Sequence, residues 1–169
     1  PISGNESIDD QTGRSKKGDS QSKKQADRLI ELAMSADIFC SSPNDGEVCA
    51  TIEVADHFET WPIQSKVWRR WLSHEYYRRY GESPRAQALN DAITVIIGEA
   101  LFNNPERSTA LRVGTMDGTD GVDGVGPTVY FDLGDPDWRV VEINANGWHV
   151  KKRDTTVRFV RKQGMLRLP

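Results

Sequence analysis

The amino-acid sequence predicts an α+β domain: an N-terminal helix, a β-hairpin, two central helices and then an antiparallel β-meander, packed in two layers. Apolar residues recur with the period of a helix in three segments before Asn103, and with the period of two that strands show from Asn103 onward. Helices followed by a run of strands are typical of two-layer α+β folds. A chain of 169 residues, 37% of them hydrophobic, is long enough to bury one core without disulfides or a metal.

The first 24 residues are predicted to be a disordered tail or linker, and residues 25–169 a single α+β domain. The tail consists mainly of Ser, Gly, Asp, Gln and Lys, so it has almost no apolar surface to offset the entropy of ordering it. Because the chain starts at Pro1 rather than Met and stops abruptly at Pro169, we expect it to be a piece of a longer protein.

The remaining elements follow from hydrophobic periodicity and from turn residues. They are a helix at 25–35, paired strands at 47–54 and 57–63, helices at 65–80 and 83–102, and strands at 110–114, 128–133, 138–143, 148–152 and 156–161. Ser83-Pro84 suits a helix start. Asn146-Gly147 between alternating runs is the strongest hairpin signal, and the Gly- and Asp-rich stretch 114–127 is predicted to be a loop.

The helix at 65–80 has the clearest signals. Ser65 can cap its N-terminus, and Gly81 can end it. Advancing 100° per residue gathers apolar residues on one broad side, which is predicted to face the core: Val67, Trp68, Trp71, Leu72 and Tyr76. The opposite side collects Lys66, Arg69, Arg70, Ser73 and Tyr77.

Cations gather on that polar helix side and in the last strands, although the formal net charge of the chain is -3. Clustered Lys and Arg are suited to phosphate contacts. If the helix side and the strand face share one side of the molecule, the sequence predicts nucleic-acid contacts from Lys66, Arg69, Arg70, Tyr77, Lys151, Arg158 and Lys162. Two other interpretations stay open: an ordinary solvated helix face, and neutralisation of the basic segments by the acidic residues of 114–142.

No residue pattern assigns catalysis, a metal or a cofactor. The glycines of 114–127 precede a strand, whereas a phosphate-binding loop precedes a helix, and Cys40 and Cys49 lack the spacing of zinc ligands. Carboxylates of the kind that hold Mg²⁺ do cluster later in the chain, at Asp132, Asp135, Asp137 and Glu142. Asp-Pro-Asp is also a turn composition, in which Asp side chains bond their own backbone, and this interpretation is favoured.

A set of short motifs covers most of the chain from Gly46 onward. They are Glu59-Thr60-Trp61-Pro62-Ile63, Ser65-Lys66, Arg69-Arg70-Trp71-Leu72, Gln87-Ala88-Leu89-Asn90-Asp91-Ala92, Tyr130-Phe131-Asp132-Leu133-Gly134-Asp135, Trp138-Arg139, Val141-Glu142-Ile143, Gly147-Trp148 and Val157-Arg158-Phe159. Together they resemble a region of phage and mobile-element replication proteins of the primase-helicase type. In the proteins that the chain resembles, this region lies upstream of a P-loop ATPase. The resemblance therefore implies a non-catalytic accessory domain and supplies no catalytic residues.

The leading functional hypothesis is an accessory domain of such a replication protein, with DNA and the downstream ATPase domain as partners and no membrane. Because two cysteines give no disulfide framework, a cytoplasmic location is expected. One alternative is a protein-interaction or packing domain without nucleic-acid binding, which would show an exposed apolar patch. The other is a metal-dependent nuclease or primase-like enzyme built on Asp132, Asp135 and Glu142.

Overall fold

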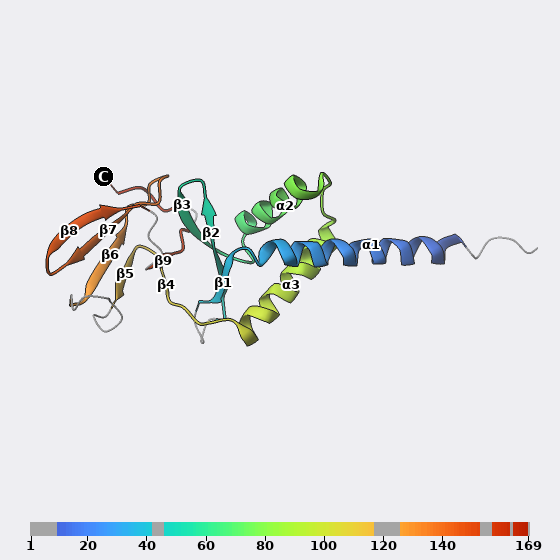
Figure 1. Ribbon diagram of the computed structural model, residues 1–169, viewed down its shortest axis with the longest axis horizontal. Helices are drawn as coiled ribbons and strands as arrows, with labels where there is room; N and C mark the ends of the chain where they lie inside the picture. The colour runs from blue at the N-terminus through green and yellow to red at the C-terminus, as the bar shows by residue number, and fades with distance from the viewer. Residues whose placement is uncertain (1–9, 42–45, 117–125, 153–156, 163, 169) are drawn as a thin grey trace, which may run out of the picture.

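The computed structural model describes residues 10–41, 46–116, 126–152, 157–162 and 164–168. Its three helices and its antiparallel sheets confirm the predicted α+β class. The helices lie at one end of an elongated molecule, a three-stranded sheet lies in the middle, and a four-stranded sheet forms the other end (Figure 1). The predicted loop 114–127 falls mostly outside the described residues.

The helical end packs on the three-stranded sheet, whose order is β1-β2-β3. The elements are α1 (Asp10–Ala33), β1 (Asp37–Cys40), β2 (Val48–Val54), β3 (His57–Pro62), α2 (Lys66–Tyr80) and α3 (Ala86–Asn103). β2 and β3 form the predicted hairpin, and β1 adds a third antiparallel strand that the sequence analysis did not predict. The main core between helices and sheet includes Leu29, Ile63, Trp68, Leu72, Tyr76 and Ile96.

Both predicted ends of α2 are confirmed. The Ser65 hydroxyl accepts a hydrogen bond from the Trp68 backbone N–H at 3.2 Å. Gly81 ends the helix at φ 70°, a left-handed conformation that glycine adopts without strain. The buried stripe is narrower than predicted: Trp71 is half-buried, and Val67, at the edge of the stripe, is 44% exposed and not a core residue.

α1 and α3 begin at other positions than the sequence analysis predicts. α1 starts at Asp10, so residues 10–24 of the predicted tail belong to a helix, whose lysines and glutamines are good helix formers. α3 starts at Ala86 without a side-chain cap of its own. The buried Gln25 of α1 instead accepts a hydrogen bond from the Arg85 backbone N–H at 3.0 Å. One helix therefore satisfies a terminal backbone group of another.

The other end of the molecule is the predicted antiparallel meander, in the order β5-β6-β7-β8. The strands are β5 (Val113–Met116), β6 (Thr128–Asp132), β7 (Val140–Asn144) and β8 (Gly147–Lys151). The last predicted strand, 156–161, does not extend the meander. Its described part, β9 (Arg158–Phe159), pairs in parallel with β4 (Thr109–Ala110), and Val160 forms a parallel bridge to Thr60 of β3. These contacts join the two larger sheets.

Both cysteines are buried in the three-stranded sheet, Cys40 on β1 and Cys49 on β2, and neither forms a disulfide. Burial raises the pKa of the Cys49 thiol to about 12, with a smaller contribution from Glu47. Cys49 is thus the small buried strand residue that its sequence context predicts. None of the helices in the described residues is both long and apolar enough to cross a membrane.

The Gln25 contact predicts a measurable loss of stability. Gln25→Ala removes a buried acceptor of the Arg85 N–H, so we expect the free energy of unfolding in urea to fall by about 1–3 kcal/mol. The matched control is Gln21→Ala, because Gln21 accepts from the Arg85 side chain at 2.9 Å on the exposed surface. It should change stability by less than about 0.5 kcal/mol. Equal losses in the two variants would contradict the capping role.

Candidate functional site

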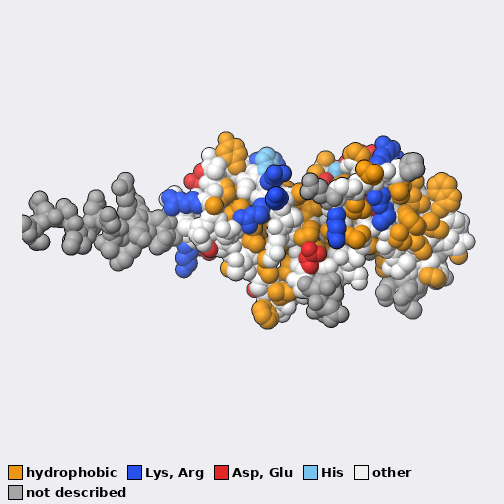
Figure 2. All heavy atoms as spheres, turned by 180° about the vertical axis from the view of Figure 1, so that it is seen from behind, with side chains coloured by type: hydrophobic (Ala, Val, Ile, Leu, Met, Phe, Trp, Pro, Cys, Tyr) orange, Lys and Arg blue, Asp and Glu red, His pale blue; other side chains and the backbone are white. Residues whose placement is uncertain are grey.

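The predicted cations of α2 lie together on its exposed side. Lys66, Arg70 and Tyr77 are exposed, and within the described ranges neither Lys66 nor Arg70 forms an ion pair. Arg69 lies beside them and donates a hydrogen bond to the Asn90 side-chain oxygen at 2.6 Å. Lys and Arg side chains gather over this helix in the space-filling view (Figure 2). These residues, Lys66, Arg69, Arg70 and Tyr77, are called the α2 cation face.

Two of the predicted C-terminal cations are bound to carboxylates. Lys151 of β8 forms an ion pair with Glu142 of β7. Arg158 of β9 pairs with Asp37 of β1 at 2.9 Å, and its side chain is only 14% exposed. Lys162 is exposed. Because β8 and α2 lie at opposite ends of the molecule (Figure 1), the structure does not bring Lys151 onto the α2 cation face.

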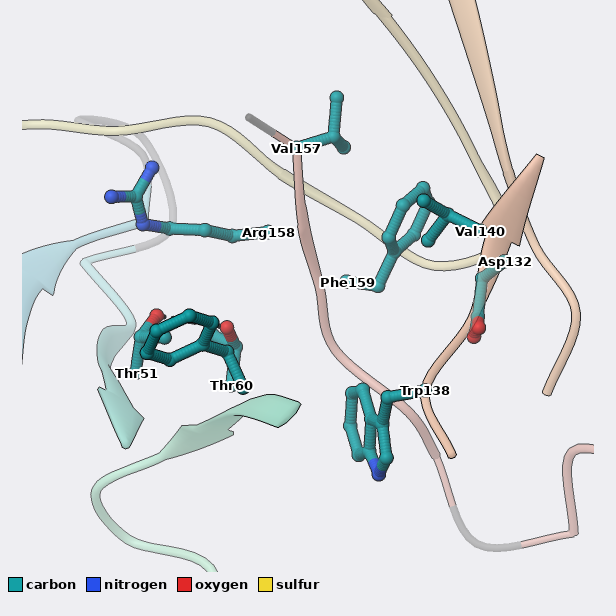
Figure 3. A pocket seen from close by; sticks show the side chains of 9 residues that line it. Thr51, Thr60, Asp132, Trp138, Val140, Val157, Arg158 and Phe159 are labelled. Carbon is teal, nitrogen blue, oxygen red and sulfur yellow. Dashed lines mark hydrogen bonds between the residues drawn. The ribbon is translucent and has the colours of Figure 1, made fainter. Parts of the chain in front are cut away.

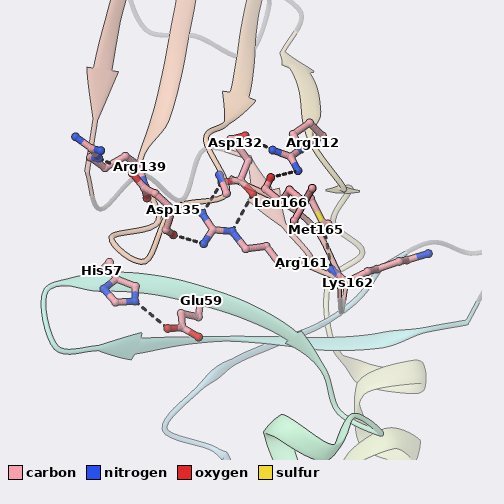
Figure 4. A network of polar contacts seen from close by, with 11 residues as sticks. His57, Glu59, Arg112, Asp132, Asp135, Arg139, Arg161, Lys162, Met165 and Leu166 are labelled. Atoms are coloured by element: carbon pink, nitrogen blue, oxygen red, sulfur yellow. Dashed lines mark hydrogen bonds and ion pairs between the residues drawn. The ribbon is translucent and has the colours of Figure 1, made fainter. Parts of the chain in front are cut away.

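The C-terminal segment instead contributes Arg161, whose side chain is only 15% exposed. The Arg161 guanidinium contacts both carboxylate oxygens of Asp132, at 2.5 and 2.9 Å, and donates to the backbone carbonyl of Asp135 (Figure 4). Arg139 binds the Asp135 carboxylate at 2.6 Å. Asp132 and Asp135 are each 1% exposed, so these contacts satisfy carboxylates that water does not reach. We call Arg161, Asp132, Asp135 and Arg139 the junction network.

An aromatic side chain completes the junction network. The Arg161 guanidinium lies 3.9 Å from the ring centroid of Trp138, a cation–π distance. On β3, the His57 ring stacks with Trp138 at 6.4 Å between centroids. Trp138 sits in the β6–β7 turn with φ 50°, a left-handed conformation that a bulky residue rarely adopts. This strained turn presents the indole ring to both partners.

The turn itself forms as the sequence analysis favours. The Asp132 carboxylate accepts from the Gly134 backbone N–H at 3.0 Å, and the Asp135 carboxylate accepts from the Arg139 backbone N–H at 3.0 Å. Aspartates that bond their own backbone in this way stabilise turns. The acidic side chains of the β6–β7 connection are therefore used for turn and junction geometry.

Two carboxyl groups of this region, Asp135 and Glu142, have lowered pKa values. Burial alone would raise the pKa of Asp135, but the backbone N–H and guanidinium of Arg139 outweigh burial, and the pKa lies below its ordinary value. Burial likewise opposes ionisation of Glu142, and hydrogen bonds from Lys151 and Tyr130 lower its pKa below the ordinary value. In the part of the chain that the structure describes, no three His, Cys, Asp or Glu side chains are grouped to hold a metal ion.

A small cleft lies between the two larger sheets beside the junction network. It is lined by Thr51, Phe58, Thr60, Asp132, Trp138, Val140, Val157, Arg158 and Phe159 (Figure 3). Its free volume is about 10 Å³, whereas one water molecule needs roughly 10–15 Å³ of such space. The cleft therefore has room for at most a single water molecule and not for a substrate.

The junction network and its role were missed by the sequence analysis. Arg161 was counted only among the cations of the last strand. Its partner Asp132 lies 29 positions earlier, and no local spacing links the two. The open interpretation that acidic residues of 114–142 neutralise the basic segments describes Arg161 and Lys151, whose partners are Asp132 and Glu142. It does not describe Arg158, which pairs with Asp37, or the α2 cation face.

Comparison with known proteins adds no further assignment. The chain matches no protein-family model, no curated protein and no solved structure. The resemblance to phage and mobile-element replication proteins therefore rests on the sequence motifs alone.

The junction network predicts that Arg161 is essential for stability. Arg161→Met leaves the buried Asp132 carboxylate without its partner, so we expect the free energy of unfolding to fall by about 3–5 kcal/mol in urea. Lys162→Met is the matched control, since the neighbouring side chain is exposed. Lys162→Met should lower the free energy of unfolding by less than about 0.5 kcal/mol. A small effect of Arg161→Met would show that the network does not hold the sheets together.

The lowered pKa of Asp135 predicts a loss of stability in acid. A lowered native pKa stabilises the fold above the ordinary pKa of the unfolded carboxyl, and this contribution disappears as the pH falls through the native value. We expect unfolding free energy to decrease from about pH 4 downward, with a shallower decrease in Asp135→Asn. Part of the pH dependence should remain in this variant, because the pKa of Glu142 is lowered as well. Asp137→Asn, in the same turn but exposed, should retain the wild-type slope.

Proposed function

We propose that the chain is a non-catalytic accessory domain that contacts a nucleic-acid backbone through the α2 cation face. One observation carries the proposal: Lys66 and Arg70 remain exposed and without ion pairs among the described residues, whereas Arg161, Arg158 and Lys151 are held by carboxylates. Cations that already form ion pairs with carboxylates gain little free energy by binding a phosphate. Unpaired cations on one rigid helix are available to bind it.

The spacing of the α2 cation face suits an extended polyanion. At 100° per residue, positions 66, 70 and 77 lie within about 40° of one another, and they span roughly 16 Å along the helix. Tyr77 is 57% exposed, and its hydroxyl adds a neutral hydrogen-bond donor to the two cations. The face can therefore follow several consecutive phosphates without reading base identity.

The motif resemblance favours nucleic acid over other polyanions, because the proteins that the chain resembles act in replication. The proposed surface is smaller than the groove that the sequence analysis predicts. Lys151 and Arg158 are excluded from it by their partners Glu142 and Asp37. Of the predicted contact residues Lys151, Arg158 and Lys162, only Lys162 is exposed, and the proposal does not depend on it.

A salt titration with fluorescent oligonucleotides tests this function. At about 50 mM salt we expect micromolar binding, with a slope of log K against log salt near −2 to −3 for about three phosphate contacts. Lys66→Glu with Arg70→Glu should weaken binding at least about tenfold and flatten the slope. Lys23→Glu with Lys24→Glu, an equal charge change on exposed residues of α1, should have a smaller effect.

Three outcomes would contradict the proposal. One is the absence of binding to single- and double-stranded oligonucleotides at low salt. Another is an equal loss in the α2 and α1 double variants, which would assign binding to overall charge. Binding to anionic lipid vesicles with no binding to oligonucleotides would also overturn it, in favour of a membrane surface.

A further inference from the structure

A second and larger groove runs along the β5 edge of the four-stranded sheet. Its free volume is about 850 Å³, and it is lined by the continuous segment 107–116, which contains β4 and β5, and by Val157 and Arg158. A Cβ atom at Gly114, in the middle of β5, would collide with the Val157 side chain. Glycine at this position therefore lets Val157 pack directly against the strand and form one wall. We call this space the β5 groove.

β5 has main-chain hydrogen-bonding groups that the sheet does not use. The Asp132 N–H donates to the Arg112 carbonyl at 2.9 Å, which makes these two residues a hydrogen-bonded pair of the β5–β6 ladder. Pairs of that kind alternate along an antiparallel ladder with pairs that are not hydrogen-bonded. The N–H and C=O groups of Val113 and Thr115 therefore point away from β6. Among the described residues, no other main-chain group bonds to them.

The two edges of this sheet differ in their protection against further pairing. Edge strands are commonly protected by charged residues or proline, which hinder the addition of another chain. β8, at one edge, ends in Lys151. β5, at the other edge, has the sequence Val-Gly-Thr-Met, with neither a charge nor a proline. The β5 edge is therefore suited to accept a further strand.

We infer that the β5 groove binds an acidic segment of a partner protein, which adds to the sheet as an extended strand beside β5. A peptide strand carries both N–H donors and C=O acceptors, so it can pair with both kinds of group at Val113 and Thr115. The phosphate oxygens of a nucleic acid only accept hydrogen bonds, and they would lie against the two carbonyls without pairing. The main chain of the edge therefore favours a peptide over a nucleic-acid strand.

The charge of the lining favours an acidic peptide. The lining includes Arg107, Arg112 and Arg158 and contains no Asp or Glu. Asp37 pairs with both Arg107, at 3.4 Å, and Arg158, at 2.9 Å, so two guanidinium groups share this carboxylate. Arg112 donates to two main-chain carbonyls, which accept its hydrogen bonds without neutralising its charge. Glu and Asp side chains of a partner complement such a cationic lining.

The same charge argues against a second copy of this chain as the partner. Two β5 edges paired about a two-fold axis would bring two sets of these arginines close together. Like charges that meet across an interface oppose association. An acidic strand from a different protein meets no such repulsion.

Fluorescence anisotropy with a labelled peptide and the whole chain tests the inference. The probe is a peptide of about eight residues that alternates Thr and Glu, so that one face of the extended strand is acidic. In about 150 mM salt we expect a Kd on the order of 100 µM. The same peptide with Lys in place of Glu should bind at least about tenfold more weakly. No binding of the acidic peptide, or equal affinity for the two peptides, overturns the inference.

Thr115→Pro tests the strand edge itself. This variant removes an N–H that β6 does not use, and an edge strand tolerates proline where its nitrogen faces solvent. We expect an unchanged circular dichroism spectrum and at least about tenfold weaker binding of the acidic peptide. Thr115→Val keeps the N–H, so this matched control should bind as the wild type does. Wild-type affinity in a folded Thr115→Pro variant overturns the inference.

N-methylated probes give a second measurement that needs no change in the protein. N-methylation of every Thr, or instead of every Glu, removes the N–H groups from one edge of the peptide strand. One of these two peptides should lose at least about tenfold in affinity, because its missing N–H groups are those that face β5. The other should bind like the parent peptide. Equal affinity of the two N-methylated peptides contradicts main-chain pairing.

The α2 cation face provides the control for other sites of binding. β5 and α2 lie at opposite ends of the molecule (Figure 1), so Lys66→Glu with Arg70→Glu should bind the acidic peptide as the wild type does. Loss of peptide binding in this double variant would assign the peptide to the α2 cation face and overturn the inference. A dimer of the wild type that Thr115→Pro abolishes would assign the edge to a second copy instead. None of these measurements depends on nucleic-acid binding.

Discussion

The ion pair between Arg161, whose side chain is 15% exposed, and the buried Asp132 is the constraint on which the junction of the two larger sheets depends. An arginine removed from water must find hydrogen-bond acceptors, and Asp132 and the Asp135 carbonyl supply them. Those residues belong to the β6–β7 turn, and Trp138 of the same turn reaches His57 on β3. The C-terminal segment, the four-stranded sheet and the three-stranded sheet therefore meet at one set of contacts. Removing one side chain of the junction network leaves its partners without the hydrogen bonds and ion pairs that satisfy them.

The pairing of arginine and lysine side chains with carboxylates explains where unpaired cations lie on the surface. Asp132, Asp37 and Glu142 neutralise Arg161, Arg158 and Lys151, respectively, where the sheets meet or pair. The exposed side of α2 keeps cations without such partners among the described residues. The helical end is thus suited to a polyanion.

Features set by neighbouring residues were predictable from the sequence. The ends of α2 follow from Ser65 and Gly81 because capping depends on a few adjacent positions. Features that depend on distant residues were not predictable from the sequence. β9 pairs with β4 across more than 40 residues, and Gln25 caps a helix that begins 60 positions later. The four-residue β1 is too short to show a period.

The two buried cysteines allow opening of the three-stranded sheet to be followed chemically. A thiol reacts with alkylating reagents as the thiolate and only when the reagent reaches it. Cys49 is fully buried, and burial keeps its thiol protonated with a pKa of about 12. Alkylation of Cys49 at neutral pH therefore requires that β2 separate from its neighbours. The rate of modification reports how often this strand opens, with no label added to the protein.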